Sequence, residues 1–330
     1  MVSQKYLLTG VTGGLGGKIL EDMLNRLNLP AASITATSRS ESSRGLFESQ
    51  GLNFKVLDYD RPETIREALV GVDNFLFMSA SEFDNDKRRI MHRNVVDAAK
   101  AVGVRKTWYV SLAFGGFGVN EKVSVQAVHN WTEEMLIESN MDFVSIRAGV
   151  YADAFPLFMN WYPESKAIHL PKLEPPVSSG YIALTSRDEL GEGIASLLTQ
   201  GLEAHPSIKP HGERQIVLLT SAVTSTFIDI ANAINSVRIQ QQPVDFLEPT
   251  EWVEDAAKTD LGSKSKAWFE TRLTWFREMC NGALETTDPA LETLLGRKPL
   301  SGVEIVKSLV GGSNGEYTWH QNSGGARSAK

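Results

Sequence analysis

The stretch that decides the fold is "YLLTGVTGGLGGKILEDML", residues 6–24. It joins a short apolar run to an amphipathic helical pattern through five glycines within eight residues, spaced GxxGxxG at Gly10, Gly13 and Gly16. Glycine lets the backbone turn tightly and approach a ligand closely, and the first turn of a helix adds unpaired N–H groups at the positive end of its dipole. The stretch therefore predicts a strand, loop and helix that bind a pyrophosphate. The alternative is a glycine-rich turn that only packs the helix against the strand.

The chain as far as residue 150 alternates between strand-like and helical patterns. The strand-like runs are Tyr6–Thr9, Ile34–Thr37, Phe54–Leu57, Asn74–Met78, Thr107–Ser111 and Phe143–Arg147. This regular alternation predicts an α/β protein with a doubly wound parallel sheet, the Rossmann fold. In that fold ligands bind beyond the carboxyl ends of the strands, where the glycine loop lies.

The end of the second strand indicates which dinucleotide is bound. An Asp or Glu there binds the ribose hydroxyls of NAD, whereas the 2′-phosphate of NADP needs a cation. In "TATSRSESSR", Ser38 and Arg39 stand at that position and Arg44 follows. A guanidinium binds a phosphate through paired hydrogen bonds. The sequence thus favours NADP(H) as the cofactor; the alternative for Arg39 is an ordinary solvated loop residue.

We expect three regions along the chain. Residues 1–150 are predicted to form an NADP-binding Rossmann domain, and a strand at 215–219 is predicted to rejoin its sheet. Residues 151–310 are predicted to form a smaller, mainly helical substrate-facing region. Its amphipathic helix at 264–280 carries an aromatic stripe that either packs in the core or covers a flat aromatic ligand. Residues 311–330, rich in Gly and Ser, are predicted to be a disordered tail.

Composition narrows the class of protein. The 330 residues are 42% hydrophobic and carry a net charge of -7 with no basic stripe, which argues for a globular protein and against direct binding to nucleic acid or to an anionic membrane. A single cysteine, Cys280, permits no internal disulfide. With no leader and no long apolar run in this sequence, we expect a cytoplasmic protein, with a homo-oligomer possible.

Several segments resemble a known family. The glycine motif, "LDYDRPETIREALVGVD" at 57–73, "LFMSA" at 76–80 and "IRAGVYAD" at 146–153 resemble the NmrA-like branch of atypical short-chain dehydrogenases. More narrowly, they are similar to the bacterial quinone oxidoreductase and triphenylmethane reductase group. The resemblance covers about residues 5–250 and is most specific before residue 150.

The resemblance implies that NADP(H) lies along the carboxyl edge of the sheet. The residues that it implies for the pyrophosphate are Gly10, Thr12, Gly13, Gly14, Leu15 and Gly16. It further implies Ser38 and Arg39 for the 2′-phosphate, Asp58 and Tyr59 for the adenine side, and Ser79 and Ala80 beside the nicotinamide ribose. The alternative for Asp58 is a loop cap before the helix that Pro62 opens.

The proton donor of ordinary short-chain dehydrogenases is missing. Those enzymes use a Tyr-x-x-x-Lys pair after the fifth strand and a Ser at its end. Here Ser111 is present, but Val125 and His129 stand where the Tyr and the Lys would be. Reduction of an isolated ketone leaves a strongly basic alkoxide, whereas reduction of a quinone leaves a phenolate-like anion with a pKa of roughly 10. The sequence therefore favours a flat, conjugated acceptor.

His129 is the best candidate for a proton donor, and Ser111 is its companion as a catalytic residue. The relatives that the sequence resembles have the same His, and the alternative is a hydrogen bond to the nicotinamide ribose or a plain surface role. Where those relatives have an Asn after the Arg of the sixth strand, this chain has Ala148. The predicted acceptor pocket is lined by Tyr151, Phe155, Phe158 and Trp161, and the alternative for these residues is core packing.

No metal site is predicted, because His205 and His211 lack the spacing of metal ligands. Lys122 is best interpreted as a solvated loop residue. The leading hypothesis is an NADPH-dependent reductase of a small quinone-like or polyaromatic substrate, acting in secondary metabolism. The alternatives are a non-catalytic NADP-binding redox sensor and a tailoring enzyme with a non-reductive net reaction.

Overall fold

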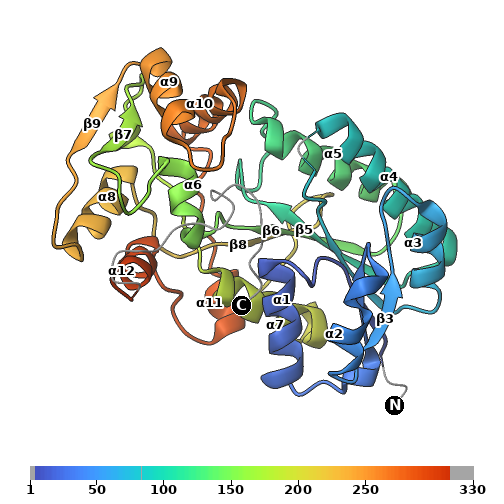
Figure 1. Cartoon of the computed structure of the whole chain (residues 1–330). Coiled ribbons are helices and arrows are strands. Elements are labelled where there is room, and N and C mark those ends of the chain that lie inside the picture. The colour runs from blue at the N-terminus through green and yellow to red at the C-terminus, as the bar shows by residue number, and fades with distance from the viewer. Residues whose placement is uncertain (1–3, 83, 313–330) are drawn as a thin grey trace.

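A seven-stranded parallel sheet forms the centre of the protein in this computed structural model, which describes residues 4–82 and 84–312 (Figure 1). The strand order is β3-β2-β1-β4-β5-β6-β8. The strands are β1 (Tyr6–Leu8), β2 (Ile34–Ser38), β3 (Asn53–Val56), β4 (Asn74–Met78), β5 (Lys106–Leu112), β6 (Phe143–Ala148) and β8 (Ile216–Leu219). The six strands expected before residue 150 are present within a few residues of their predicted ends. The doubly wound Rossmann fold is therefore confirmed.

Helices cover both faces of the sheet. On one face lie α1 (Gly14–Asn25), α7 (Arg187–Gln200) and α11 (Ala290–Leu295), and on the other lie α3 (Pro62–Leu69), α4 (Asn85–Val102) and α5 (Ser124–Ser139), with the short α2 (Arg44–Glu48) packed beside β3. The alternation of strand side chains supplies the two cores. Leu7 and Phe75 pack toward α3 and α4, whereas Leu8 and Leu76 pack toward α1 and α7.

The chain returns to this sheet after a long excursion. β8 pairs in parallel with β6, with Ser145 opposite Ile216, which is the pairing expected of a strand at 215–219. Helices α7 and α11 also pack on the sheet, although they follow residue 150 in the sequence. We call the sheet with the helices on its two faces the sheet region.

The remaining elements form a second body, which we call the α10 region. A two-stranded parallel sheet of β7 (Ile168–Pro171) and β9 (Val244–Leu247) lies among its helices. The helices are α6 (Phe155–Met159), α8 (Phe227–Ser236), α9 (Pro249–Thr259), α10 (Lys266–Cys280) and α12 (Gly302–Gly312). They share one large hydrophobic core, separate from the two cores of the sheet region. Figure 1 shows this body, in green and orange, beside the sheet at the end away from β3.

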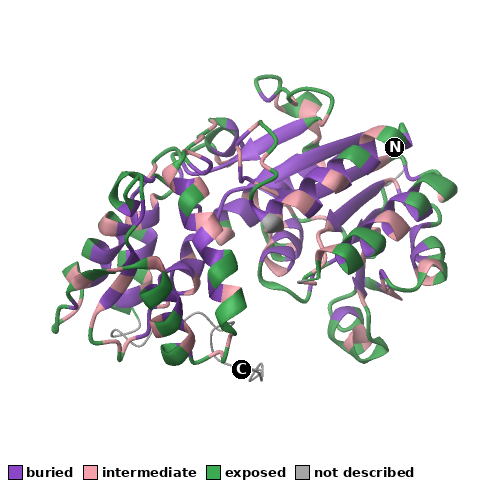
Figure 2. Ribbon diagram, turned by 90° about the horizontal axis from the view of Figure 1, so that it is seen from above, coloured by how far each residue is buried: buried purple, intermediate pink, exposed green. Residues whose placement is uncertain are grey.

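Short 3-10 segments complete the described chain: Ala31–Ser33, Glu41–Ser43, Ala152–Ala154, Val177–Ser179 and Leu202–Ala204. The predicted disordered tail, 311–330, lies outside the described residues except for its first two, which end α12. Figure 2 shows that buried residues fill the strands, while exposed residues lie along the outer helices and loops. No helix in the described part of the chain is long and apolar enough to cross a membrane.

Candidate active site

The glycine loop makes a tight turn between β1 and α1. Gly10 has φ of +70°, in the left-handed region that favours glycine, and a Cβ on Gly16 would overlap the carbonyl oxygen of Gly10. Gly13 is the N-cap residue of α1, and neither a capping side chain nor an acidic residue of the first turn accepts from its amides. An anionic ligand is the natural acceptor for such amides, so the loop fits a diphosphate.

The other predicted loop residues differ in what they offer. Thr12 and Gly14 are both exposed. Thr12 can therefore offer its side chain and its main chain to a ligand, and Gly14 can offer its main chain. Leu15 is buried in the core between α1 and the sheet. Only the main chain of Leu15 is therefore available to a ligand.

An arginine far along the sequence approaches this loop. Arg187, the first residue of α7, lies so close to Gly14 that any side chain at position 14 would overlap its guanidinium. The guanidinium also forms an ion pair with Asp153 and lies over the ring of Tyr151, 5.3 Å from its centroid. Sequence reasoning missed Arg187, because only tertiary packing of α7 on α1 brings it to the loop.

The end of β2 has one available cation. Arg39 is exposed and has no ion pair with the described residues, whereas Arg44 pairs with Glu41 and Glu48. Ser38 accepts hydrogen bonds from the amide of Ser40 and the hydroxyl of Ser43, so it orders the loop that follows. Of the two predicted arginines, Arg39 is the one accessible to a phosphate.

The two residues predicted at the adenine side are engaged within the fold. The Asp58 carboxylate accepts from the amide of Asp60 at 3.1 Å and from Arg61 Nε at 3.1 Å, as expected of a loop cap before α3. Tyr59 is buried, and its hydroxyl donates to the carbonyl of Met78 at 2.8 Å. Burial raises the pKa of Tyr59. Both contacts shape the carboxyl edge of the sheet.

Two residues of α4 hold the loop after β4. Arg88 donates to the Ser79 hydroxyl at 2.5 Å, and the amide of Ala80 donates to His92 Nε2 at 3.0 Å. Because Nε2 accepts, the ring proton of His92 lies on Nδ1 and is donated to the Thr132 hydroxyl at 2.7 Å. Burial, with Arg88 nearby, lowers the pKa of His92 to about 3, so the ring is neutral at pH 7. The predicted Ser79 and Ala80 loop is thus rigidly supported.

His129 lies at the centre of the same buried network. Arg88 donates to its Nε2 at 3.0 Å, and its Nδ1 lies 2.8 Å from the Tyr109 hydroxyl. Because a guanidinium can only donate, Nε2 is the acceptor and the ring proton on Nδ1 is donated to Tyr109. Burial and the charge of Arg88 hold the pKa of His129 well below its usual value. The geometry favours an ordering role for His129 over proton donation, which stays a prediction.

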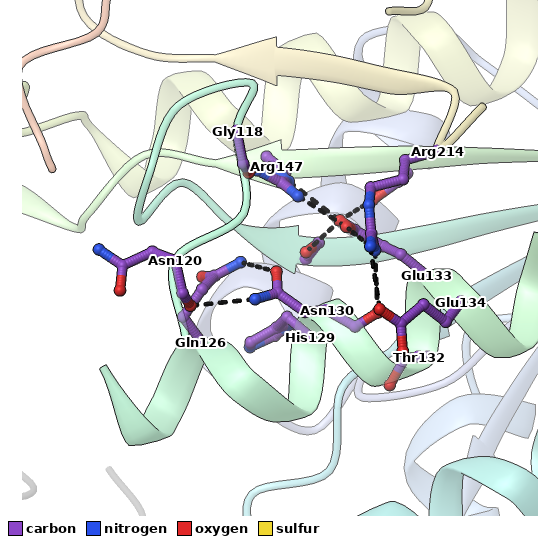
Figure 3. A network of polar contacts seen from close by, with 12 residues as sticks. Gly118, Asn120, Gln126, His129, Asn130, Thr132, Glu133, Glu134, Arg147 and Arg214 are labelled. Carbon is purple, nitrogen blue, oxygen red and sulfur yellow. Dashed lines mark hydrogen bonds and ion pairs between the residues drawn. The ribbon is translucent and has the colours of Figure 1, made fainter. Parts of the chain in front are cut away.

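Ser111 belongs to a second network, around Glu133. The Ser111 hydroxyl donates to Glu133 Oε1 at 3.0 Å, and Arg147 donates to both carboxylate oxygens, at 3.0 and 2.7 Å. Figure 3 shows Arg147, on β6, and Arg214, in the turn before β8, converging on Glu133. Ser111 is buried and its proton is engaged, so the geometry does not favour the catalytic role predicted for it.

The predicted pocket aromatics lie in the core of the α10 region. Phe155 and Trp161 are buried, and Trp161 Nε1 donates to Gln242 at 2.8 Å. Tyr151 is partly exposed beneath Arg187. Phe158 contributes to a small cavity beneath α10. Of the four residues, Tyr151 and Phe158 are therefore the ones placed to meet a ligand.

The remaining candidates have ordinary environments. Lys122 is 75% exposed and pairs with Glu278 at 3.5 Å, as expected of a solvated loop lysine. Among the described residues, no group of three His, Cys, Asp or Glu side chains is arranged to hold a metal ion. His211 packs against the ring of Phe117.

Comparison with known proteins places this geometry in context. A family model described as NAD(P)H-binding matches residues 10–200. The chain is 40% identical over 319 residues to the NmrA-like family domain-containing oxidoreductase flvB of Aspergillus flavus, a match that covers 96% of this chain and 98% of the relative. The similarity therefore includes both the sheet region and the α10 region.

Two bacterial proteins are more distant. Quinone oxidoreductase 2 of Escherichia coli is 32% identical over 148 residues, which is 45% of this chain and 49% of that protein. The solved structure of the Citrobacter sp. triphenylmethane reductase complexed with NADP(H) is 25% identical with a TM-score of 0.77, covering 92% of this chain and 99% of that one. The first match covers less than half of each chain, whereas the second covers nearly all of both.

Proposed function

The chain belongs to the NAD(P)H-binding family as an NmrA-like, NADP-dependent oxidoreductase, and from this we propose that it reduces a flat, conjugated acceptor of the quinone or polyaromatic kind. NADPH, when bound, supplies the hydride from its nicotinamide ring. The chain itself supplies binding, orientation and exclusion of water. A place in secondary metabolism remains a prediction.

One observation carries the choice of acceptor. The positions of the Tyr and Lys of ordinary short-chain dehydrogenases hold Val125 and His129, and His129 is buried and neutral with both ring nitrogens engaged. A strongly basic alkoxide would have no positioned acid from these residues. A reduced quinone leaves a phenolate-like anion with a pKa of roughly 10, which takes its proton from water. A conjugated acceptor is therefore the class of substrate that least requires a positioned proton donor in this site.

We assign the cofactor contacts from the position of each residue in the fold. The amides of the glycine loop would bind the diphosphate, and Arg39 would bind the 2′-phosphate. Arg187 adds positive charge beside the diphosphate. The Ser79 and Ala80 loop, held by Arg88 and His92, would lie beside the nicotinamide ribose. The names of the relatives, a quinone oxidoreductase and a triphenylmethane reductase, support an aromatic acceptor.

A screen of acceptors with NADPH tests the proposal. Purified protein is expected to oxidise NADPH, read as loss of its absorbance, when menadione-type quinones are added. Gly13→Asp is expected to abolish the reaction, because it places a carboxylate at the N-cap of α1 where the diphosphate would bind. Binding of NADPH with no turnover by any quinone or dye would contradict the proposed acceptor class.

A further inference from the structure

An arginine is buried beneath the aromatic side chains of α10. Arg272 is 3% exposed. Its guanidinium carbon lies 3.8 Å from the ring centroid of Trp275, 4.1 Å from that of Trp268 and 5.2 Å from that of Phe158. Aromatic faces attract a cation, but each such contact supplies only about 0.5–2 kcal/mol. The rings therefore hold the guanidinium in place without neutralising its charge.

No carboxylate in the described part of the chain compensates this charge. Among residues 4–82 and 84–312, Arg272 has no ion pair, and its buried Nη1 has no hydrogen-bond partner. Burial lowers the pKa of Arg272 to about 9, so the group remains a cation at pH 7. An uncompensated buried charge costs several kcal/mol. Such a group is expected where a ligand completes the pairing.

A second donor next to the guanidinium is also without an acceptor. Trp275 Nε1 is buried and has no hydrogen-bond partner in the described structure. Arg272 and Trp275 line the same cavity, together with Phe114 and Phe158. The two residues that carry these unpartnered N–H donors thus line one apolar hollow. A carbonyl oxygen would satisfy the donors but not the charge, so an anionic oxygen fits best.

The cavity lies on the side of the molecule where an acceptor would bind. Phe114 follows β5, and the amide of Gly115 donates to the carbonyl of Ala283 at 2.7 Å, which joins the end of β5 to the turn after α10. Phe158 is on α6, which follows β6. Segments that follow β5 and β6 therefore supply Phe114 and Phe158 to the cavity that Arg272 also lines. Ligands of doubly wound sheets bind at this edge.

The size of the cavity limits what enters it. Its volume of about 10 Å³ is about that needed by one water molecule. A carboxylate oxygen has this size, whereas an aromatic ring does not. The ring of a ligand would have to lie outside the cavity, toward the sheet.

We propose that Arg272 and Trp275 Nε1 form an anion-recognition point, and that the natural acceptor is a flat molecule bearing a carboxylate. This inference rests on the proposed function and names its substrate more narrowly. The carboxylate pairs with the guanidinium between the tryptophan rings and directs the conjugated part of the molecule toward the nicotinamide side of the sheet edge.

A binding experiment that needs no turnover tests this proposal. Calorimetry on the NADP⁺-loaded protein compares 2-naphthoate with 2-naphthamide, which has the same ring system without the charge. Wild-type protein is expected to bind the naphthoate at least about 10-fold more tightly. Arg272→Met is expected to remove that preference. Arg277→Met, an exposed arginine on the same helix, is the matched control and is expected to keep it.

Two further measurements separate recognition from a structural role. Arg272→Met removes an unpaired buried charge, so its melting temperature is expected to equal or exceed that of the wild type. Trp275→Phe keeps a ring but removes the Nε1 donor, and it is expected to reduce the preference by a smaller factor. Equal wild-type binding of the two probes, or an Arg272→Met protein that keeps the preference, would overturn the proposal.

The experiments distinguish failure of this anion-recognition point from failure of the proposed function. If wild-type protein prefers naphthoate but none of the acceptors supports oxidation of NADPH, the anion-recognition point stands and the proposed function fails. If menadione is reduced but the two probes bind equally, the proposed function stands and the anion point fails.

Discussion

Two buried arginines, one in each region of the molecule, differ in how their charge is accommodated. Arg147, in the sheet region, is fully buried and pairs with the equally buried Glu133 at 2.7 Å. Its Nη1 donates to the carbonyls of Gly116 and Gly118, so its donors are used within the fold (Figure 3). Arg272, in the α10 region, has aromatic faces and no carboxylate among the described residues.

The difference teaches where a ligand can act. At Glu133 the fold itself pairs the buried charge of Arg147. The groups proposed for a ligand in the sheet region are the main-chain amides of the glycine loop and two arginines, Arg39 and Arg187. In the α10 region the group proposed to bind a ligand is a buried side chain, that of Arg272. A charge that the fold itself pairs is structural, whereas a charge left unpaired in an apolar site is a candidate for recognition.

The largest expected effect comes from removing Glu133, the carboxylate that pairs with the buried Arg147. Glu133→Ala leaves Arg147 buried and uncompensated, so the free energy of unfolding is expected to fall by about 3–5 kcal/mol. Denaturant unfolding measures it. Glu134→Ala, which removes the neighbouring half-exposed carboxylate, is the control and is expected to cost about 0–1 kcal/mol. A loss below about 1 kcal/mol for Glu133→Ala would show that Arg147 does not depend on its partner.

The second prediction tests recognition by main-chain amides. In Gly16→Ala the new Cβ would overlap the backbone of Gly10, so the loop must move and NADPH is expected to bind about 100-fold more weakly, or about 2.7 kcal/mol. Titration calorimetry with NADPH measures the change. In Gly17→Ala the Cβ would lie 3.4 Å from the Val11 carbonyl oxygen, and binding is expected to persist. Comparable loss in both variants would argue against a specific fit of the loop.

The third prediction concerns neutral groups in the sheet region. His92 has a pKa of about 3 in the fold and about 6.5 unfolded, so below pH 6.5 the unfolded chain binds more protons. Its contribution to stability is complete above pH 6.5 and is lost as the pH falls toward 3. At pH 5 the loss is expected to be about 2 kcal/mol.

Unfolding of wild-type protein and of His92→Gln at pH 7 and pH 5 measures this effect. Gln can accept from the Ala80 amide and donate to Thr132, but it does not titrate. The difference between the two pH values is therefore expected to shrink in the variant. An unchanged difference would assign the pH dependence to other groups, such as His129.

The smallest expected effect concerns the exposed cation, Arg39. Arg39→Asp replaces a solvated guanidinium, so the preference for NADPH over NADH is expected to fall by about 10-fold, or about 1.4 kcal/mol, with little change in unfolding. Dissociation constants for both cofactors measure it. Arg44→Ala, which removes a guanidinium already paired with Glu41 and Glu48, is the control. An unchanged preference in Arg39→Asp would refute its assignment to the 2′-phosphate.

Much of the fold follows from local patterns in the sequence. Short apolar runs predicted β1 to β6, and a helical pattern with an amphipathic face predicted α10. These signals are local because strand and helix periods repeat within a few residues. The two-stranded sheet of β7 and β9 was not predicted, because each strand is only four residues long and 72 residues separate the two along the chain.

The candidate site divides in the same way. The glycine loop and Arg39 could be proposed from the sequence, because the role predicted for each depends on neighbours within one turn. Arg88 and Arg187 were not found, because each acts on a segment that only folding brings near. Ser111 was proposed from its residue type and its place at the end of the fifth strand, but its contact with Glu133 could not be read from the sequence.

By itself the sequence determined a strand, glycine loop and helix, an NADP-type second strand, and the loss of the Tyr and Lys pair, because each is written in adjacent residues. Only the tertiary structure decided which charges are paired, which histidines are neutral, and that Arg272 is buried among aromatic rings without a carboxylate. The reason is physical: hydrogen bonds and ion pairs act over a few ångströms of space, whatever the distance along the chain.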